Sequence, residues 1–356
     1  MNNKRAVRAV LLFLVCAFFL VGCNGNIFSG GERLSIEAEI CQVKDDRAAI
    51  VTIISDDGYY ESGVILNSLA KDIGIHVTVS GFVNNIASYL EEWKEIEKEG
   101  FVEVISHSYS HLKINDETNP SREEIYHEYV DAKEYYENNF ETPAFCFVTP
   151  NNATTETGYE ILQENNFLAV RQGQRGENSL SPEWGMEPGD WLNLMTRGIG
   201  DVDNTEERNK WIDTAIENRS WLIEMWHDIS PNGDLHYQPI STEMAKEHLT
   251  YISEKQEDVW IAPFTQAVSY IYKKEYCMVE AYCTENEIVL QLSRKRNDLP
   301  WDEFNAPISI CLKLPDGWEK VHSLEDNCII QECENPSYII INTEVTQGAL
   351  HFTRAE

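Results

Sequence analysis

Basic residues are scarce in this sequence. The 356-residue chain contains 28 lysines and arginines against 60 aspartates and glutamates, which gives a formal net charge of −32 at pH 7. Such a protein repels polyanions, so the composition argues against nucleic acids and anionic surfaces as partners. The acidic excess does not identify a substrate, because an acidic, solvated surface is the simpler explanation.

Several other features are missing. The sequence has no internal repeat of solenoid or propeller period and no low-complexity segment. It also lacks Cys-x-x-Cys spacing, which argues against a structural zinc site. Five of the nine cysteines lie in the last quarter of the chain, where export would allow one or two disulfides: Cys277, Cys283, Cys311, Cys328 and Cys333.

The N-terminal segment is typical of a bacterial lipoprotein signal. Three basic residues precede the apolar stretch Ala9–Leu20, which is too short for a comfortable membrane span, and the small Gly22 directly precedes Cys23. We expect residues 1–22 to be the signal peptide, Cys23 to carry the lipid and residues 23–45 to form a tether. The protein would then be anchored to the membrane at the bacterial cell surface or in the periplasm. An uncleaved signal anchor is the alternative.

Residues 46–276 alternate between short apolar runs and amphipathic stretches, the pattern of parallel strands with covering helices. The expected strands are Ala48–Ser55, Ile75–Gly81, Phe101–Ser106, Ala144–Thr149, Phe167–Arg171, Trp221–Trp226 and Asp258–Ala262. The expected helices are Ser62–Ile73, Asn85–Glu99, Ser121–Asn138, Thr154–Asn165, Glu206–Asn218 and Thr242–Gln256. About seven β/α units predict an α/β fold with a barrel-like parallel sheet.

The pattern changes after Tyr276. Alternating segments such as Glu287–Leu292, Ile308–Leu314 and Tyr338–Thr343 are separated by turn signals. Residues 277–356 therefore predict a small, all-β, sandwich-like domain. It would either bind carbohydrate or cover an edge of the barrel, and a structural or weak binding role is favoured.

Carboxylates and imidazoles follow the ends of the expected strands. Asp56 and Asp57 come after the first strand, His107 after the third and His227 after the sixth. In a parallel barrel these C-terminal ends meet on one face, where such enzymes carry out their chemistry. His111 lies four residues after His107, so both imidazoles can meet one cation if the loop makes a helical turn. The pattern indicates a metal site with a base beside it.

These residues resemble the signature motifs of the polysaccharide deacetylases of the NodB-homology type, carbohydrate esterase family 4. The resemblance covers roughly residues 46–272 and follows the family's order. The five segments are Thr52–Gly58, Ser106–His111, Thr149–Asn151, Pro188–Trp191 and Glu224–Asp228. The implied fold is a distorted (β/α)7 barrel followed by the β domain.

The resemblance implies that Asp57, His107 and His111 hold a divalent cation, usually zinc. Cobalt, nickel or manganese would suit the same ligands. Asp56 would be the general base, and His227 would protonate the departing amine or alcohol. The backbone N–H of Asn151 would be a donor to the oxyanion.

The third motif departs from the family. An arginine that orients the catalytic aspartate is expected two residues before the motif's proline, but Val148 occupies that position. Arg171 or Arg197 could take its place in space. Asp190 is the expected partner of that arginine and is therefore expected to be a catalytic residue.

Two further residues are expected to bind substrate. Trp191 follows Asp190 in the fourth motif, and Met225 would line a pocket for the acetyl methyl group beside His227. Each could instead be ordinary core.

The resemblance therefore implies a metal-dependent hydrolase that removes N-acetyl or O-acetyl groups from a polysaccharide such as peptidoglycan or a chitin-like glycan. Acetylxylan is an alternative substrate. Another alternative is a catalytically impaired carbohydrate-binding lipoprotein, which Val148 would explain. The expected partners are the acetylated polysaccharide and the membrane, reached through the lipid on Cys23. The oligomeric state stays open.

Overall fold

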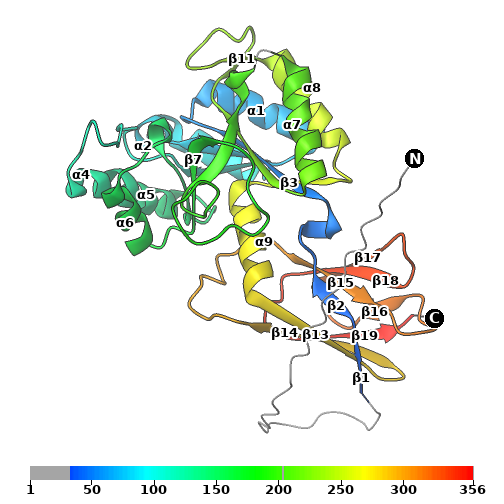
Figure 1. Ribbon diagram of the computed structural model, residues 1–356. Coiled ribbons are helices and arrows are strands. Elements are labelled where there is room, and N and C mark those ends of the chain that lie inside the picture. The colour runs from blue at the N-terminus through cyan, green and yellow to red at the C-terminus, as the bar shows by residue number, and fades with distance from the viewer. Residues whose placement is uncertain (1–32, 203, 356) are drawn as a thin grey trace, which may run out of the picture. The chain divides into compact units, whose positions relative to one another are not determined.

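The computed structural model describes residues 33–355 except residue 203 (Figure 1). The predicted signal peptide, Cys23 and the beginning of the predicted tether lie outside the described residues. Within the described part of the chain, no helix is long and apolar enough to cross a membrane.

Seven parallel strands form a closed ring, because the last of them pairs with the first. In ring order they are β3 (Ala49–Ser55), β4 (Val77–Gly81), β5 (Val102–Ser106), β6 (Cys146–Val148), β7 (Ala169–Arg175), β8 (Leu194–Gly198) and β9 (Trp221–Trp226). The β3–β9 ladder runs from Ile50 opposite Trp221 to Ser55 opposite Trp226. The predicted barrel-like α/β fold is confirmed.

One member of the ring was not expected. Strand β8 is short and contains polar residues, so its sequence shows little strand pattern. The expected strand at 258–262 is present as β12 (Val259–Ile261), but it lies outside the ring and pairs with the first residues of β3. β4 pairs with β3 only at Ile54 and Ser55, so the ring is distorted where β12 is added.

Helices follow most of the strands, as predicted (Figure 1). They are α1 (Tyr60–Ile73), α2 (Val83–Ile86), α3 (Leu90–Lys98), α4 (Arg122–Tyr126), α5 (Ala132–Asn139), α6 (Glu156–Glu164), α7 (Thr205–Asn218) and α8 (Thr242–Glu254). Local signals set several ends: Ser121 and Glu124 form a capping box, and Gly74 ends α1 in the left-handed conformation.

Helix α9 (Phe264–Tyr276) was not predicted, and it is tied to the N-terminal end of the barrel. The Phe264 N–H donates to Thr78 Oγ1 (2.9 Å), and the Thr265 N–H donates to Glu103 Oε1 (3.0 Å). Thr78 and the Thr265 hydroxyl also donate to Glu103, which is buried. These bonds satisfy backbone donors at the helix N-terminus, which would otherwise lack partners.

Two antiparallel sheets pack against each other through a shared apolar core, which confirms the all-β region. One sheet contains β1 (Leu34–Ile36), β13 (Cys277–Cys283), β14 (Glu287–Arg294), β19 (Gly348–Arg354) and β16 (Val321–Ser323). The other contains β17 (Cys328–Glu332), β18 (Tyr338–Thr343), β15 (Ile308–Lys313) and β2 (Ala38–Ile40).

The two N-terminal strands correct the predicted tether. β1 pairs with β13, and β2 pairs with β15. Residues 34–40 were assigned to the tether, but they are edge strands of the two sheets. The tether prediction was wrong there because a three-residue strand has too little pattern to be recognised before its pairing partner is known.

The expected disulfides are also absent, since all seven cysteines of the described residues are free. Strand register explains this. Cys277 lies opposite Arg294, Cys311 opposite Ile340 and Cys328 opposite Thr343, so none of these thiols faces another cysteine across the sheet.

Glu103 provides a test of how α9 is held. Burial raises the pKa of this carboxyl above its ordinary value of about 4.5. The folded protein therefore keeps the proton at pH values where the unfolded chain has released it, and stability falls as pH rises from there toward the folded pKa. Glu103→Gln removes this loss. We expect the unfolding free energy of the variant, relative to wild type, to increase as pH rises above 4.5, by at most about 1.4 kcal/mol per pH unit, and to level off above the folded pKa.

Urea denaturation of both proteins at several pH values measures this difference. The exposed Glu92→Gln is the matched control and should show no such trend. A difference that stays flat or shrinks with pH would contradict the role assigned to Glu103.

Candidate functional site

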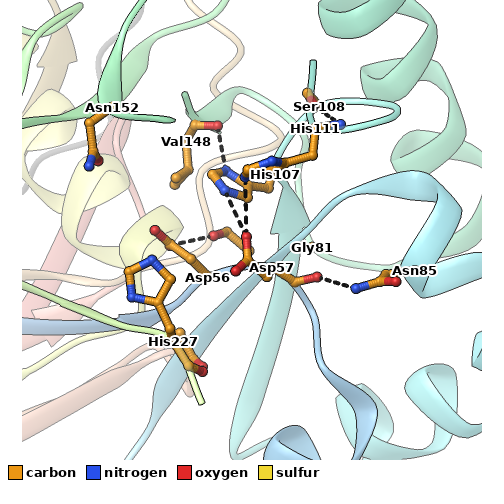
Figure 2. Close-up of polar contacts among 12 residues, drawn as sticks. Asp56, Asp57, Gly81, Asn85, His107, Ser108, His111, Val148, Asn152 and His227 are labelled. Carbon is orange, nitrogen blue, oxygen red and sulfur yellow. Dashed lines mark hydrogen bonds and ion pairs between the residues drawn. The ribbon is translucent and has the colours of Figure 1, made fainter. Parts of the chain in front are cut away.

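The C-terminal ends of the barrel strands bring the candidate groups together (Figure 2). Asp56 follows β3, His107 follows β5 and His227 follows β9. The ladders continue for one residue past these ends: the Asp56 N–H donates to Trp226 O (2.9 Å), and the His107 N–H donates to Gly81 O (2.8 Å). The positions of these residues are therefore set by the barrel backbone.

Asp57, His107 and His111 form a three-ligand cluster. Asp57 Oδ1 lies 3.6 Å from His107 Nε2 and 3.2 Å from His111 Nε2. One ligand atom from each residue lies within 4.8 Å of the others. Figure 2 shows both rings turned toward the Asp57 carboxylate. The sequence prediction brought together the same three residues.

The hydrogen bonding of His107 suits a cation ligand. Its Nδ1 lies 2.9 Å from the carbonyl oxygen of Val148, which can only accept, so Nδ1 carries the proton. In the neutral ring the lone pair is then on Nε2, which faces Asp57. A backbone carbonyl that sets the tautomer in this way is a usual partner of histidines that bind metals. One carboxylate and two imidazoles are a donor set that fits zinc or a similar divalent ion.

Asp57 and His111 affect each other's protonation. Burial opposes the charged form of Asp57, but the neighbouring imidazoles of His107 and His111 outweigh it and lower the Asp57 pKa. Burial also opposes protonation of His111, yet the hydrogen bond and charge of Asp57 raise the His111 pKa. The Asp57 carboxylate is therefore ionised, as a metal ligand must be.

The backbone around the cluster adopts unfavourable conformations. Asp57 (φ 70°), Ser108 (φ 79°) and His111 (φ 64°) lie in the left-handed region that non-glycine residues usually avoid. At Gly58 (φ 65°) a Cβ atom would lie 2.9 Å from the Cα of Gly81, so only glycine fits between these strand ends. Strained backbone of this kind is concentrated at functional sites.

Glu128 holds the loop that carries His111, and sequence analysis did not identify it. The carboxylate accepts hydrogen bonds from the Ser110 hydroxyl and from the Ser110 N–H (2.9 Å). Glu128 is buried in the π-helical turn His127–Asp131 between α4 and α5. Such turns are frequent at functional sites. No local motif marks this glutamate, because its partner is 18 residues away.

Asp56 is buried in an ion pair with Arg171. Nη2 of Arg171 donates to Asp56 Oδ2, and the Ser80 hydroxyl donates to Oδ1 (2.8 Å). Burial opposes ionisation, but Arg171 and then His107 outweigh it and lower the Asp56 pKa. Arg171 therefore occupies, from β7, the place in space that Val148 leaves without a cation. Arg197, the other candidate, pairs with Glu177 instead (3.3 Å).

His227 is buried beside Asp56. Burial lowers its pKa, and Asp56 and Asp57 oppose this effect. Its Nδ1 is buried without a hydrogen-bond partner in the described part of the chain. The Tyr237 ring meets the imidazole edge-on, with centroids 4.8 Å apart.

These groups line one cavity of about 350 Å³. Its lining includes the predicted Asp56, Asp57, His107, His111, His227 and Asn151, together with Tyr59, Thr149, Asn152 and Tyr237. Asn152 also accepts a hydrogen bond from Arg171 (2.9 Å). Tyr59 stacks on His236, with centroids 4.1 Å apart. Tyr59 and Tyr237 come from loops after different strands, so spacing alone could not have brought them together.

Three predicted residues do not line the cavity. Asp190, expected to be catalytic, accepts a hydrogen bond from the Glu187 N–H (3.0 Å) in the loop between β7 and β8. Trp191, expected to bind substrate, is core and packs on Tyr272 at 4.5 Å. Met225 is buried with its sulfur 3.3 Å from Arg171 Nη1, behind the ion pair. β7 and β8 are joined by a loop that returns to the start of the barrel, which separates Asp190 from the strand ends.

Comparison with known proteins finds a family model that matches the first part of the barrel. Residues 44–170 match the family model described as polysaccharide deacetylase. The matched segment contains the first three of the five motif segments. No curated protein matches the chain significantly.

Solved structures resemble the chain over the barrel. A provisionally assigned polysaccharide deacetylase from Mycobacterium smegmatis has 12% identity and a TM-score of 0.51, covering 67% of this chain and 94% of its own. A family 4 carbohydrate esterase pseudoenzyme from Bacillus anthracis has 14% identity and a TM-score of 0.44, covering 62% and 65%. A family 4 carbohydrate esterase from Streptomyces lividans, in complex with acetate, has 13% identity and a TM-score of 0.40, covering 60% and 91%. At 12% identity, the first likeness concerns the fold alone.

The buried ion pair makes Arg171 important for stability. Arg171→Met leaves the Asp56 carboxylate buried without its cation, which costs about 3 kcal/mol of unfolding free energy. Urea denaturation measures the loss. The control is Arg197→Met, which breaks a partly exposed pair and should cost under about 1 kcal/mol. The double variant Asp56→Asn/Arg171→Met should recover part of the loss, since no buried charge remains. Equal losses for the two arginine variants would rule out this account.

The cluster also predicts binding of one divalent cation per chain. Removal of a direct ligand by Asp57→Ala, His107→Ala or His111→Ala should weaken cobalt binding more than the roughly 10–100-fold that loss of an outer partner costs. Calorimetry and the visible absorption of bound cobalt measure this affinity. His127→Ala is the control, because that exposed imidazole bonds to Asp131 and not to the cluster. Unchanged binding in all three ligand variants would exclude this site.

Proposed function

Because residues 44–170 match the polysaccharide deacetylase family model, we propose that the chain is a metal-dependent hydrolase that removes acetyl groups from a polysaccharide. The observation that carries this proposal is the convergence, in one cavity, of the Asp57–His107–His111 cluster and the Asp56–Arg171 pair. The cluster supplies cation ligands, and the pair supplies an oriented carboxylate that is not itself a ligand.

Asp57, His107 and His111 would hold the cation. When bound, a divalent cation of this kind polarises a carbonyl group and acidifies water. The proline-containing turn after β6 lies against the same cavity through Thr149 and Asn151. There the backbone N–H of Asn151 would donate to the oxygen of the acetyl carbonyl as negative charge develops.

Asp56 would accept the proton of the attacking water. This role requires an ionised carboxylate in a fixed orientation. Arg171 and Ser80 each hold one of its two oxygens, and the low pKa keeps it ionised. Arg171 therefore acts as a positioning residue for Asp56.

His227 would transfer a proton to the departing amine or alcohol. It lies on the β9 side of the cavity, adjacent to Asp56 through the β3–β9 ladder. Imidazole is suited to this step because it can hold and release a proton near neutral pH. The Tyr237 ring packs edge-on against the imidazole.

The substrate would be an acetylated glycan. The faces of Tyr59 and Tyr237 supply aromatic surface at the cavity, and the remaining lining is polar. N-acetylated glycans such as peptidoglycan or a chitin-like polymer are the leading class, and acetylxylan is the alternative. We also propose, from the N-terminal sequence, a lipid anchor on Cys23 at the bacterial cell surface or in the periplasm.

The competing proposal is a catalytically impaired binding protein. It is suggested by Val148, which stands where an arginine is expected. The Arg171–Asp56 pair weighs against it, because the carboxylate retains a cationic partner.

Acetate release tests the proposed function. Purified protein with zinc or cobalt should release acetate from N-acetylglucosamine oligomers or from acetylxylan. Asp56→Asn and His227→Ala should each lower kcat by about 10²–10⁴-fold, because each removes a proton-transfer group.

Asp116→Asn and His322→Ala, both exposed, are the matched controls and should retain full activity. The preferred polymer identifies the substrate class. A protein that binds cobalt but releases no acetate from either substrate would favour the impaired binding protein.

A further inference from the structure

A second and larger cavity lies at the opposite end of the barrel. It has a volume of about 710 Å³. Phe145 and Leu168, which directly precede β6 and β7, contribute its barrel side, and Tyr276 at the end of α9 contributes another. Arg296 and Glu303, which lie between β14 and β15, also line it. We call this cavity the distal groove. The cation cluster and Asp56 lie at the other ends of the strands.

Trp184 lines the distal groove with an exposed indole. Its relative exposure is 53%. All nine tryptophans of the chain fall within the described residues, and the other eight are buried or partly buried. Tryptophan is highly buried on average, so the exposed indole leaves a large aromatic surface available to a ligand of the adjacent cavity.

The loop that carries Trp184 is held by its own hydrogen bonds. The Trp191 N–H donates to Glu183 O (2.9 Å) and the Leu192 N–H to Gly185 O (3.2 Å). Asp190 Oδ2 accepts from the Glu187 N–H and lies where a Cβ on Gly185 would clash, at 2.2 Å. The fourth motif segment therefore builds this loop and does not contribute to the catalytic cavity.

Trp191 anchors the same loop in the core. Its ring packs on Tyr272, itself a lining residue of the distal groove, with centroids 4.5 Å apart. Trp184 is thus presented from a fixed backbone, which limits the conformational entropy lost when a ligand binds.

The charges of the distal groove are largely compensated. Arg296 pairs with Asp298 (2.6 Å), and its guanidinium lies 5.1 Å from the centroid of the Tyr276 ring. Lys133 donates to Asn165 O (2.9 Å) and lies 3.8 Å from Glu137. The cations are therefore engaged by neighbours, which disfavours a phosphate or another strongly anionic ligand.

Neutral hydrogen-bonding groups complete the lining. Gln163, Asn166 and Asn297 place side-chain amides at the distal groove, and Glu303 adds a carboxylate. Aromatic faces together with amides and a carboxylate match the alternating apolar faces and hydroxyl edges of a pyranose chain. The volume also falls in the range of about 300–1,000 Å³ that is usual for small-molecule sites.

We propose that the distal groove is a second carbohydrate-binding site, which holds a neutral segment of the same class of glycan as the catalytic cavity. This inference rests on the proposed function for the identity of the glycan. Two sites on one chain raise the effective concentration of a polymer at the catalytic cavity, but they do nothing for an oligosaccharide too short to reach both. Loss of the distal groove should therefore weaken binding to polymer and leave turnover of short oligomers unchanged.

The test measures binding and turnover separately. Binding to insoluble chitin, peptidoglycan sacculi and acetylated xylan is measured by co-sedimentation of full-length Asp56→Asn protein, so that turnover does not interfere. Addition of Trp184→Ala should raise the dissociation constant for the polymer about tenfold, as expected for loss of an aromatic anchor. The bound fraction at limiting polymer should fall accordingly. Trp184→Phe should retain part of the binding.

Two controls accompany this measurement. Tyr126→Ala removes another exposed aromatic side chain, 43% exposed and outside the distal groove, and should leave binding unchanged. Trp184→Ala in the otherwise wild-type protein should release acetate from an N-acetylglucosamine dimer at the wild-type rate. N-acetylglucosamine hexamer should also perturb tryptophan fluorescence in the Asp56→Asn protein and do so less when Trp184 is replaced.

The outcomes separate this inference from the proposed function. Trp184-dependent glycan binding without acetate release supports the distal groove and overturns the proposed activity. Acetate release with polymer binding that does not depend on Trp184 overturns the distal groove alone. Binding of a peptide but of none of the three polymers would also overturn it.

Discussion

The pairing of β9 with β3 is the constraint on which the rest of the structure depends. This ladder closes the ring and places His227 beside Asp56, although the two residues are far apart in the sequence. β3 pairs with three strands. One edge pairs with β9, and the other pairs with β12 at the beginning of β3 and with β4 at its end. The resulting distortion is at the beginning of β3, while its end, where Asp56 and Asp57 follow, is fully paired.

The buried Asp56–Arg171 pair shows how a charge requirement can be met from a different strand. A carboxylate at this depth is costly unless a cation and hydrogen bonds compensate it. Val148 offers neither, but β7 is the next strand of the ring and carries Arg171 to the same point in space. What is required is a cation beside the Asp56 carboxylate, and side chains from several strands of the barrel can reach that position. A motif compared position by position detects only one of these solutions.

Sequence analysis predicted the elements whose patterns are local. Apolar runs identified six of the seven ring strands, and the His107–His111 spacing together with Asp57 identified the cation cluster. It failed where partners decide the structure: β1 and β2 are strands because β13 and β15 pair with them, and α9 is held by Glu103 and Thr78. Asp190 and Trp191 show the same limit, because their motif builds a loop at the far end of the barrel.

The sequence by itself determined the barrel class, the carboxylates and imidazoles at strand ends, and the likeness to polysaccharide deacetylases. These follow from periodicity and from short motifs, which contacts within a few residues control. Only the tertiary structure decided that Arg171 partners Asp56, that Glu128 holds the His111 loop, and that Trp184 is left exposed beside a second cavity. Each of these depends on which side chains meet across the fold, and the closure of the ring, not the local sequence, determines those meetings.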